Sequence, residues 1–318
     1  MSRTMNPLRA ALGSAVIMLA ALALSAVPAL AAEKYQKIEP RNMIIIGDRA
    51  VDIAFHLGVL PTGMNVRCSL WPMCDKLKVV SQPLRCPGCL TSGQTETLTK
   101  FIKAKGIKLA IVEKSQPFCI LKADSDPVKA LPLLEKLGVE AKIVDFSQGV
   151  APAIAQTAAI LGKQEAGQAL AAKYEKAVKK LDKAIAGKKL GKKVVVLQGI
   201  YQAQTGKAFI QVEAPGGYAD KFILEPLGCA NVGQALVPAG KEPAKGHWTI
   251  RKLAGLAKAK PDAIVITGDS VAVQKALAEA IVAQPELGKV PVFSLPRYID
   301  SSVIERPEIV GKWLWALK

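Results

Sequence analysis

The spacing of apolar positions in residues 163–187 predicts one long amphipathic helix. Its apolar side chains recur at the spacing of successive helical turns, at Leu170, Tyr174, Ala177, Val178, Leu181 and Ile185. The positions between them are mostly Lys, Glu, Gln and Ala, and Gly187 stands where a left-handed residue can end a helix. A helix of about 25 residues is roughly 37 Å long, which is long enough to join two lobes.

Short apolar runs and amphipathic segments alternate on both sides of this helix. Before it, we expect strands at 43–47, 109–112 and 141–144, and helices at 50–58, 95–105, 127–137 and 150–161. After it, we expect strands at 193–197, 263–267 and 291–295, and helices near 218–227, 250–259, 271–283 and 302–315. Residues 59–90 follow neither period and are expected to be irregular.

This alternation predicts the fold class, because strands that alternate with helices form mainly parallel sheets covered on both faces. We expect an α/β protein of two lobes, residues 32–162 and 188–318, each a mainly parallel sheet with flanking helices. One long helix, residues 163–187, joins the lobes.

Residues 1–31 have the pattern of a secretory signal peptide. Arg3 and Arg9 precede an apolar core from Ala15 to Val27, and Ala29-Leu30-Ala31 is an A-x-A cleavage site. The apolar run is shorter than the roughly 20 residues of a membrane-spanning helix. We therefore expect a protein free in the periplasm after cleavage.

The chain is strongly basic, and removing Arg3 and Arg9 lowers its formal net charge only from +17 to +15. Most of the excess is lysine spread along predicted helices, which is typical of a solvated basic surface, with a field that steers a ligand as the alternative. Aromatic residues are only 5% of the chain and do not alternate with basic ones, so no nucleic-acid partner is expected. No phosphate-loop, zinc-protease or hydrolase motif occurs.

Five segments together resemble one family, the helix-linked class (class III) of periplasmic substrate-binding proteins of ABC importers. These are RNMIIIGDRAVDIAFHLGV (41–59), GVEAKIVDF (138–146), FILEPLGCANVG (222–233), TIRKLAGLAKAKPDAIVITGD (249–269) and RPEIVGKWLWAL (306–317). The resemblance implies a monomeric binding protein without a catalytic step. It implies that a metal chelate of the siderophore, haem or corrinoid type, or a metal ion, is carried as cargo between the lobes. It also implies docking on a permease in the inner membrane, with Glu135, Glu225 and Glu308 as candidate contacts.

Candidate cargo contacts follow from the ends of the predicted strands, because ligands collect at the carboxyl edge of open α/β sheets. These candidates are Asp48, Arg49, Glu113, Tyr201, Asp269, Arg297 and Tyr298. Arg49 and Arg297 come from opposite lobes, and a guanidinium suits a carboxylate or phosphate. Exposed salt bridges are the alternative interpretation for all of them.

A loop residue pair, His247-Trp248, adds two candidates. The imidazole could ligate a metal centre, and the indole could stack on a planar ligand. The alternative is a loop histidine beside a packing tryptophan.

Four cysteines in residues 59–90, Cys68, Cys74, Cys86 and Cys89, have the spacing C-x5-C-x11-C-x2-C. Two disulfides are favoured in an oxidising compartment, and a transition-metal site of thiolates is the second interpretation. The third is a redox-active pair, since Cys86 and Cys89 form a C-x2-C motif before a helix. A periplasmic thiol redox or metal-chaperone protein using Cys86 and Cys89 is therefore the alternative function.

Overall fold

The computed structural model describes residues 37–318, within which Ile38–Lys318 forms one compact unit. The predicted signal segment, residues 1–31, lies outside the described residues. None of the helices in the described part is long and apolar enough to cross a membrane. The lobe boundaries at 162 and 188 stay a prediction.

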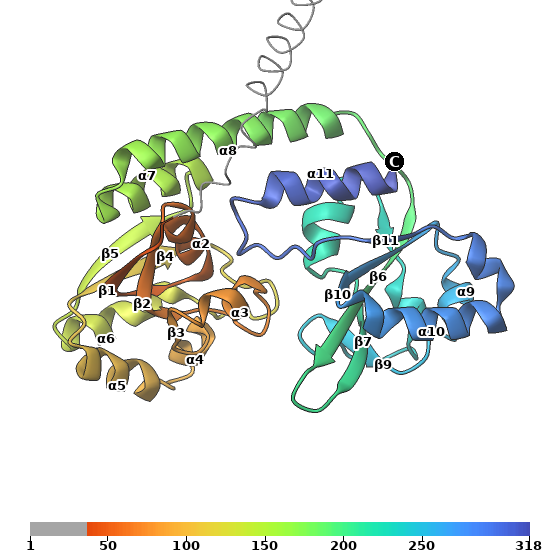
Figure 1. The fold of residues 1–318 in the computed structure, drawn as a ribbon, viewed down its shortest axis with the longest axis horizontal. Coiled ribbons are helices and arrows are strands. Elements are labelled where there is room, and N and C mark those ends of the chain that lie inside the picture. Colours follow the sequence, from red (N-terminus) through yellow and green to blue (C-terminus); the bar gives the residue numbers. More distant parts are fainter. Residues whose placement is uncertain (1–36) are drawn as a thin grey trace, which may run out of the picture. The chain divides into compact units, whose positions relative to one another are not determined.

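The first sheet is entirely parallel, with strand order β3-β2-β1-β4-β5. Its strands are β1 (Glu39–Ile46), β2 (Val59–Asn65), β3 (Gln82–Pro83), β4 (Leu109–Lys114) and β5 (Glu140–Asp145). The α-helices of this lobe, labelled in Figure 1, are α2 (Asp48–His56), α3 (Met73–Leu77), α4 (Pro87–Thr91), α5 (Glu96–Lys105), α6 (Leu131–Lys136) and α7 (Val150–Leu161), and the 3₁₀ helix Pro127–Ala130 precedes α6.

Alternate side chains of β1 enter different cores, as expected for a sheet covered on both faces. Met43 and Ile45 pack with α2 and α7, whereas Ile44 and Ile46 pack with α4, α5 and α6. The four residues are almost fully buried. This burial explains the uninterrupted apolar run of the strand.

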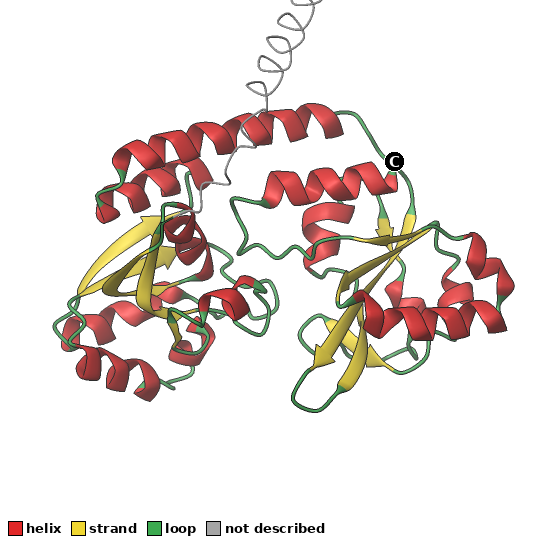
Figure 2. Cartoon of the chain, in the orientation of Figure 1, coloured by secondary structure: helices red, strands yellow, loops and turns green. Residues whose placement is uncertain are grey.

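The second sheet is mixed, with strand order β11-β10-β6-β7-β9 and β8 paired to β6. Its strands are β6 (Lys193–Gln202), β7 (Lys207–Glu213), β8 (Ala230–Asn231), β9 (His247–Ile250), β10 (Ala263–Gly268) and β11 (Val292–Ser294). The strands β7 and β9 run antiparallel to their neighbours, and the others pair in parallel. The helices, shown in red in Figure 2, are the π-helical turn Asp220–Leu224, the 3₁₀ helices Gly233–Leu236 and Pro285–Lys289, α9 (Leu256–Ala259), α10 (Ser270–Ala283) and α11 (Arg306–Leu317).

Three sequence-based expectations are corrected. Residues 59–90 are not irregular throughout, because they contain β2, whose strand pattern is interrupted by Pro61 and Gly63. Glycine is required at position 63, since a Cβ there would come within 2.6 Å of the Phe101 ring. The strand β6 continues into a hairpin with β7 through the turn at Gly206. The helix expected at 250–259 shrinks to α9, because Ile250 ends β9 and pairs with Ile210.

The long helix is α8 (Gln164–Ile185), within two residues of its expected ends. Its apolar stripe serves both lobes, because Leu170 and Tyr174 pack on the first core and Leu181 is buried in the second. Gly167 allows close approach to α7, since a Cβ there would lie 2.3 Å from the Ala158 Cβ. The lobes are therefore joined by a helix that belongs to both of their cores.

Candidate functional site

Five charged residues, four of them at or just beyond strand ends, form a buried network between the lobes, which we call the clasp. Asp48 and Arg49 follow β1, Arg67 follows β2 and Glu113 lies near the end of β4, whereas Asp300 comes from the second lobe. The turn after β1 requires Gly47, because a Cβ there would lie 2.2 Å from the Cβ of Glu113. Close packing of backbone against side chain therefore positions Asp48 and Arg49.

Arg67 is the centre of the clasp and is only 1% exposed. Its guanidinium donates to Asp48 Oδ2 at 2.7 Å and to Asp300 Oδ1 at 2.9 Å. It also donates to the Tyr218 hydroxyl at 2.8 Å, and the Phe118 ring centroid lies 4.4 Å from its Cζ. Burial opposes the charge of Arg67, but the two carboxylates outweigh that effect and raise its pKa.

Arg49 makes the second bridge between the lobes. It donates to Glu113 Oε1 at 2.8 Å and to the Ser115 hydroxyl at 2.6 Å, and it forms an ion pair with Asp300. Burial raises the pKa of Glu113, although Arg49 and Ser115 act in the opposite direction. All five clasp residues thus have polar partners, which a buried charge requires.

Two cavities are lined by residues of both lobes, and one of them is lined by the clasp residues Arg49 and Asp300. The first, which we call the disulfide-side cavity, has a volume of about 580 Å³ and is lined mostly by the segment Cys68–Lys76 and by second-lobe residues that include Ile200, Gly268, Pro296 and Arg297. The other, of about 480 Å³, is lined by Arg49, Ser115, Phe146, Lys221 and Phe222, among others. Both cavities lie at the carboxyl ends of strands, where ligands of open α/β sheets bind.

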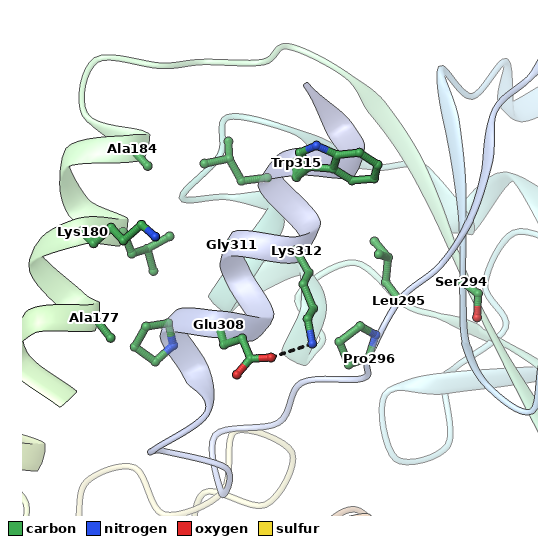
Figure 3. A pocket seen from close by; sticks show the side chains of 13 residues that line it. Ala177, Lys180, Ala184, Ser294, Leu295, Pro296, Glu308, Gly311, Lys312 and Trp315 are labelled. Carbon is green, nitrogen blue, oxygen red and sulfur yellow. Dashed lines mark ion pairs between the residues drawn. The ribbon is translucent and has the colours of Figure 1, made fainter. Parts of the chain in front are cut away.

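A larger cavity of about 840 Å³ lies elsewhere, between α8 and α11. Figure 3 shows Ala177, Lys180 and Ala184 on one side and the C-terminal helix with Trp315 on the other. The indole of Trp315 is 80% exposed. Because this groove is lined by α8 and second-lobe residues and by none from the first sheet, we do not assign the cargo to it.

Glu213, His247 and Arg297 form a second buried group, which we call the second-lobe cluster. His247 Nε2 lies 4.0 Å from Glu213 Oε2, and both side chains are almost fully buried. Burial raises the pKa of Glu213 to about 7 and lowers that of His247 to about 4. Burial also lowers the pKa of Arg297, which Glu213 counteracts.

The other predicted site residues lie in the protein interior, at a helix cap or in an exposed hairpin. Trp248 is 3% exposed, packs in the second-lobe core and donates from its indole to the Lys241 carbonyl, so its ring is not available for stacking on a ligand. Tyr298 is buried against Phe222. Asp269 caps α10 by accepting from the amides of Val271 and Ala272. Tyr201 is 56% exposed in the β6–β7 hairpin.

The four clustered cysteines do not form one ligand set. Cys68 and Cys74 are joined by a disulfide, and Cys86 and Cys89 are free thiols. Among residues 37–318, no group of three or more His, Cys, Asp and Glu side chains is arranged to hold a metal ion. Soft-metal binding by all four sulfurs would require four free thiolates.

Sequence reasoning missed several residues of the clasp and its surroundings, namely Arg67, Trp71, Tyr218, Asp300 and Ser301. Arg67 follows β2, so recognising that strand would have placed it beside the other strand-end residues. Asp300 lies in the loop after β11, six residues beyond the strand. No local pattern distinguishes it from a surface aspartate.

The comparison with protein families gives a match of residues 78–292 to the family described as periplasmic binding protein. No curated protein matches the chain.

Solved structures share the fold at low sequence identity. The periplasmic heme-binding protein BhuT, in complex with two hemes, is 17% identical, with a TM-score of 0.52 over 88% of this chain and 98% of that one. The siderophore periplasmic binding protein from the fuscachelin gene cluster of Thermobifida fusca is 14% identical, with a TM-score of 0.53 over 88% and 97%. The periplasmic vitamin B12 binding protein BtuF of Vibrio cholerae is 14% identical, with a TM-score of 0.50 over 88% and 99%.

Proposed function

The chain belongs to the periplasmic binding protein family, and on that premise we propose that it is the substrate-binding protein of an ABC importer. Its cargo is a metal chelate of the haem, siderophore or corrinoid type, which binds in the disulfide-side cavity. The protein performs no chemical step, since its task is to hold the cargo and present it to a permease. Proteins of known structure with this fold include a heme-binding protein, a siderophore-binding protein and a vitamin B12 binding protein, which supports this cargo class.

The observation that carries the proposal is the chemistry of the disulfide-side cavity. Leu70, Pro72, Met73 and Ile200 give it apolar walls suited to the organic body of a chelate. Arg297 also lines it, and within the described residues the Arg297 guanidinium has no salt bridge. A guanidinium without a salt bridge in residues 37–318 that lines this cavity favours a ligand with a carboxylate or another oxyanion.

The proposed permease contacts are Glu135 and Glu225. Both are exposed, Glu135 in α6 of the first lobe and Glu225 after the π-helical turn of the second. Glu308 is also exposed but forms an ion pair with Lys312 at 2.7 Å. Glu135 and Glu225 thus offer one carboxylate from each lobe, neither of which forms an ion pair within residues 37–318, to arginines of a membrane partner.

Titration of the purified protein with hemin, a ferric catecholate and cyanocobalamin tests the proposal, with native mass spectrometry to identify the bound form. We expect saturable binding of one class. Arg297→Ala should weaken it at least roughly tenfold, because a hydrogen bond to a charged group contributes about 1.5–3 kcal/mol.

Arg251→Ala is the matched control, since Arg251 is an exposed arginine of the same lobe outside the disulfide-side cavity. It should leave the affinity unchanged. Failure of all three compounds to bind would contradict the cargo class, and equal affinity of Arg297→Ala and the unmodified protein would remove the arginine from the site.

A further inference from the structure

The turn Cys86-Pro87-Gly88-Cys89 carries chemistry that cargo binding does not use. Four cysteines are free within the described residues, and of these Cys119 and Cys229 are buried whereas Cys86 and Cys89 are partly exposed. The two accessible thiols are therefore separated by only two residues. This arrangement is independent of the proposed cargo and of the disulfide-side cavity.

The backbone brings the two cysteines together. The Cys89 amide donates to the Cys86 carbonyl at 2.8 Å, which closes a four-residue turn, and such turns hold their first and last Cα atoms within about 7 Å. Disulfides span Cα distances of about 4.4–6.8 Å. Cys86 is extended, with φ −82° and ψ 144°, and its Sγ accepts from the Gly88 amide at 3.4 Å.

Contacts on both sides fix the turn in place. Lys122 donates to the Gly88 carbonyl at 3.1 Å, and a Cβ at Gly88 would lie 2.5 Å from the Ser125 hydroxyl. On the other side, the Arg85 carbonyl accepts from the Val66 amide at 2.9 Å, and Arg85 has a left-handed φ of 71°. A turn held in this way already has the backbone that a bond between its two sulfurs needs.

We propose that Cys86 and Cys89 form a second, reversible disulfide, which makes this turn a site of thiol–disulfide exchange with a small-molecule disulfide such as oxidised glutathione. One protein thiolate attacks a sulfur of the small disulfide, forms a mixed disulfide and releases one small thiol. The other protein thiolate then attacks the mixed disulfide and releases the second. Two electrons and two protons pass from the protein to the small disulfide, which is reduced to two thiols.

The surroundings predict the pH dependence of this exchange. Burial raises the pKa of the Cys86 thiol, an effect that the Gly88 amide opposes and the nearby Asp48 strengthens. Since the thiolate is the attacking species, exchange should accelerate as the pH rises above neutrality. The same location connects the pair to the clasp, because Arg85 pairs with the segment that leads from β2 to Arg67.

The test is equilibration of the full chain in glutathione buffers of increasing oxidising strength, followed by acid quench, alkylation in denaturant and peptide mapping. We expect Cys86 and Cys89 to lose alkylation together, with one midpoint, whereas Cys119 and Cys229 stay alkylated. In Cys86→Ser, Cys89 cannot form the intramolecular disulfide. It should therefore either carry glutathione or stay a free thiol that is alkylated.

Cys119→Ser is the matched control and should leave that midpoint unchanged. The proposal is overturned if both thiols stay alkylated in the most oxidising buffer, if they titrate independently, or if either pairs with another cysteine. Because no cargo takes part, these outcomes are independent of any failure of the chelate titration.

Discussion

The clasp and the second-lobe cluster bury ionisable groups in opposite ways. In the clasp, Arg67 contacts carboxylates from both lobes, and their charges raise its pKa by more than burial lowers it. In the second-lobe cluster, Glu213 and His247 lie 4.0 Å apart, and burial shifts both towards their uncharged forms. Burial alone therefore does not decide whether a group is ionised. The number and geometry of opposite charges around a group decide whether it keeps its charge.

The largest expected effect comes from removing the central charge of the clasp. Arg67→Met should lower the free energy of unfolding by about 3–5 kcal/mol, because it leaves Asp48 buried without its ion-pair partner and Asp300 paired only with Arg49. Denaturant unfolding measures the loss. Adding Asp48→Asn and Asp300→Asn to the variant should recover part of it. A loss below about 1 kcal/mol, the range of exposed pairs, would mean that the clasp is solvated.

The second-lobe cluster predicts two opposite pH dependences of stability. The pKa of Glu213 rises from 4.5 to about 7, so its stabilisation is present in acid and is lost as the pH rises through that interval. The pKa of His247 falls from 6.5 to about 4, so its stabilisation is present at neutral pH and is lost as the pH falls through that interval. Each group contributes at most about 3 kcal/mol, and the two slopes largely cancel in the unmodified protein.

Single substitutions should separate these slopes. In Glu213→Gln the free energy of unfolding should fall on acidification from pH 6.5 to 4, the interval set by His247. In His247→Asn it should rise on acidification from pH 7 to 4.5, the interval set by Glu213. Urea unfolding at four pH values measures both. Parallel slopes in the two variants would show that the carboxyl and imidazole are not buried as separate neutral groups.

The smallest expected effect comes from Asp269, a carboxylate whose partners are backbone amides. Asp269→Ala should cost about 1 kcal/mol of stability, the usual contribution of a helix cap, because it removes the acceptor for Val271 and Ala272. Thermal unfolding and cargo titration together test this role. Asp269→Asn keeps an acceptor and should restore most of the stability. A loss of cargo affinity in both variants would show that Asp269 contacts the cargo.

The fold was largely predictable because its strongest signals are local. The apolar stripe of α8 and the buried runs of β1, β4 and β10 specify their elements without tertiary information. The strand β2 was missed because Pro61 and Gly63 interrupt its pattern, and both are tolerated only by the neighbours that tertiary structure supplies. The π-helical turn Asp220–Leu224 also has no distinct sequence signal.

The candidate site was predictable only where strand ends reveal it. That rule named Asp48, Arg49 and Glu113, which the structure brings into one network. The loop pair His247-Trp248 gave Trp248 as a stacking surface, whereas the residue packs inside the second-lobe core. Asp300 escaped because its partner Arg67 is 233 residues away in the chain. Only the folded protein shows that such distant residues meet.

The shared helix α8 has a consequence for how the molecule loses its structure. Leu170 and Tyr174 pack on the first core and Leu181 on the second. Unfolding of one lobe, with loss of α8, would therefore expose apolar side chains of the other lobe to water. The lobes should consequently melt as one cooperative unit rather than in sequence. A destabilising substitution anywhere along α8, even far from the cargo cavity, would then lower the amount of folded protein in the cell. No protein with only one folded lobe would accumulate.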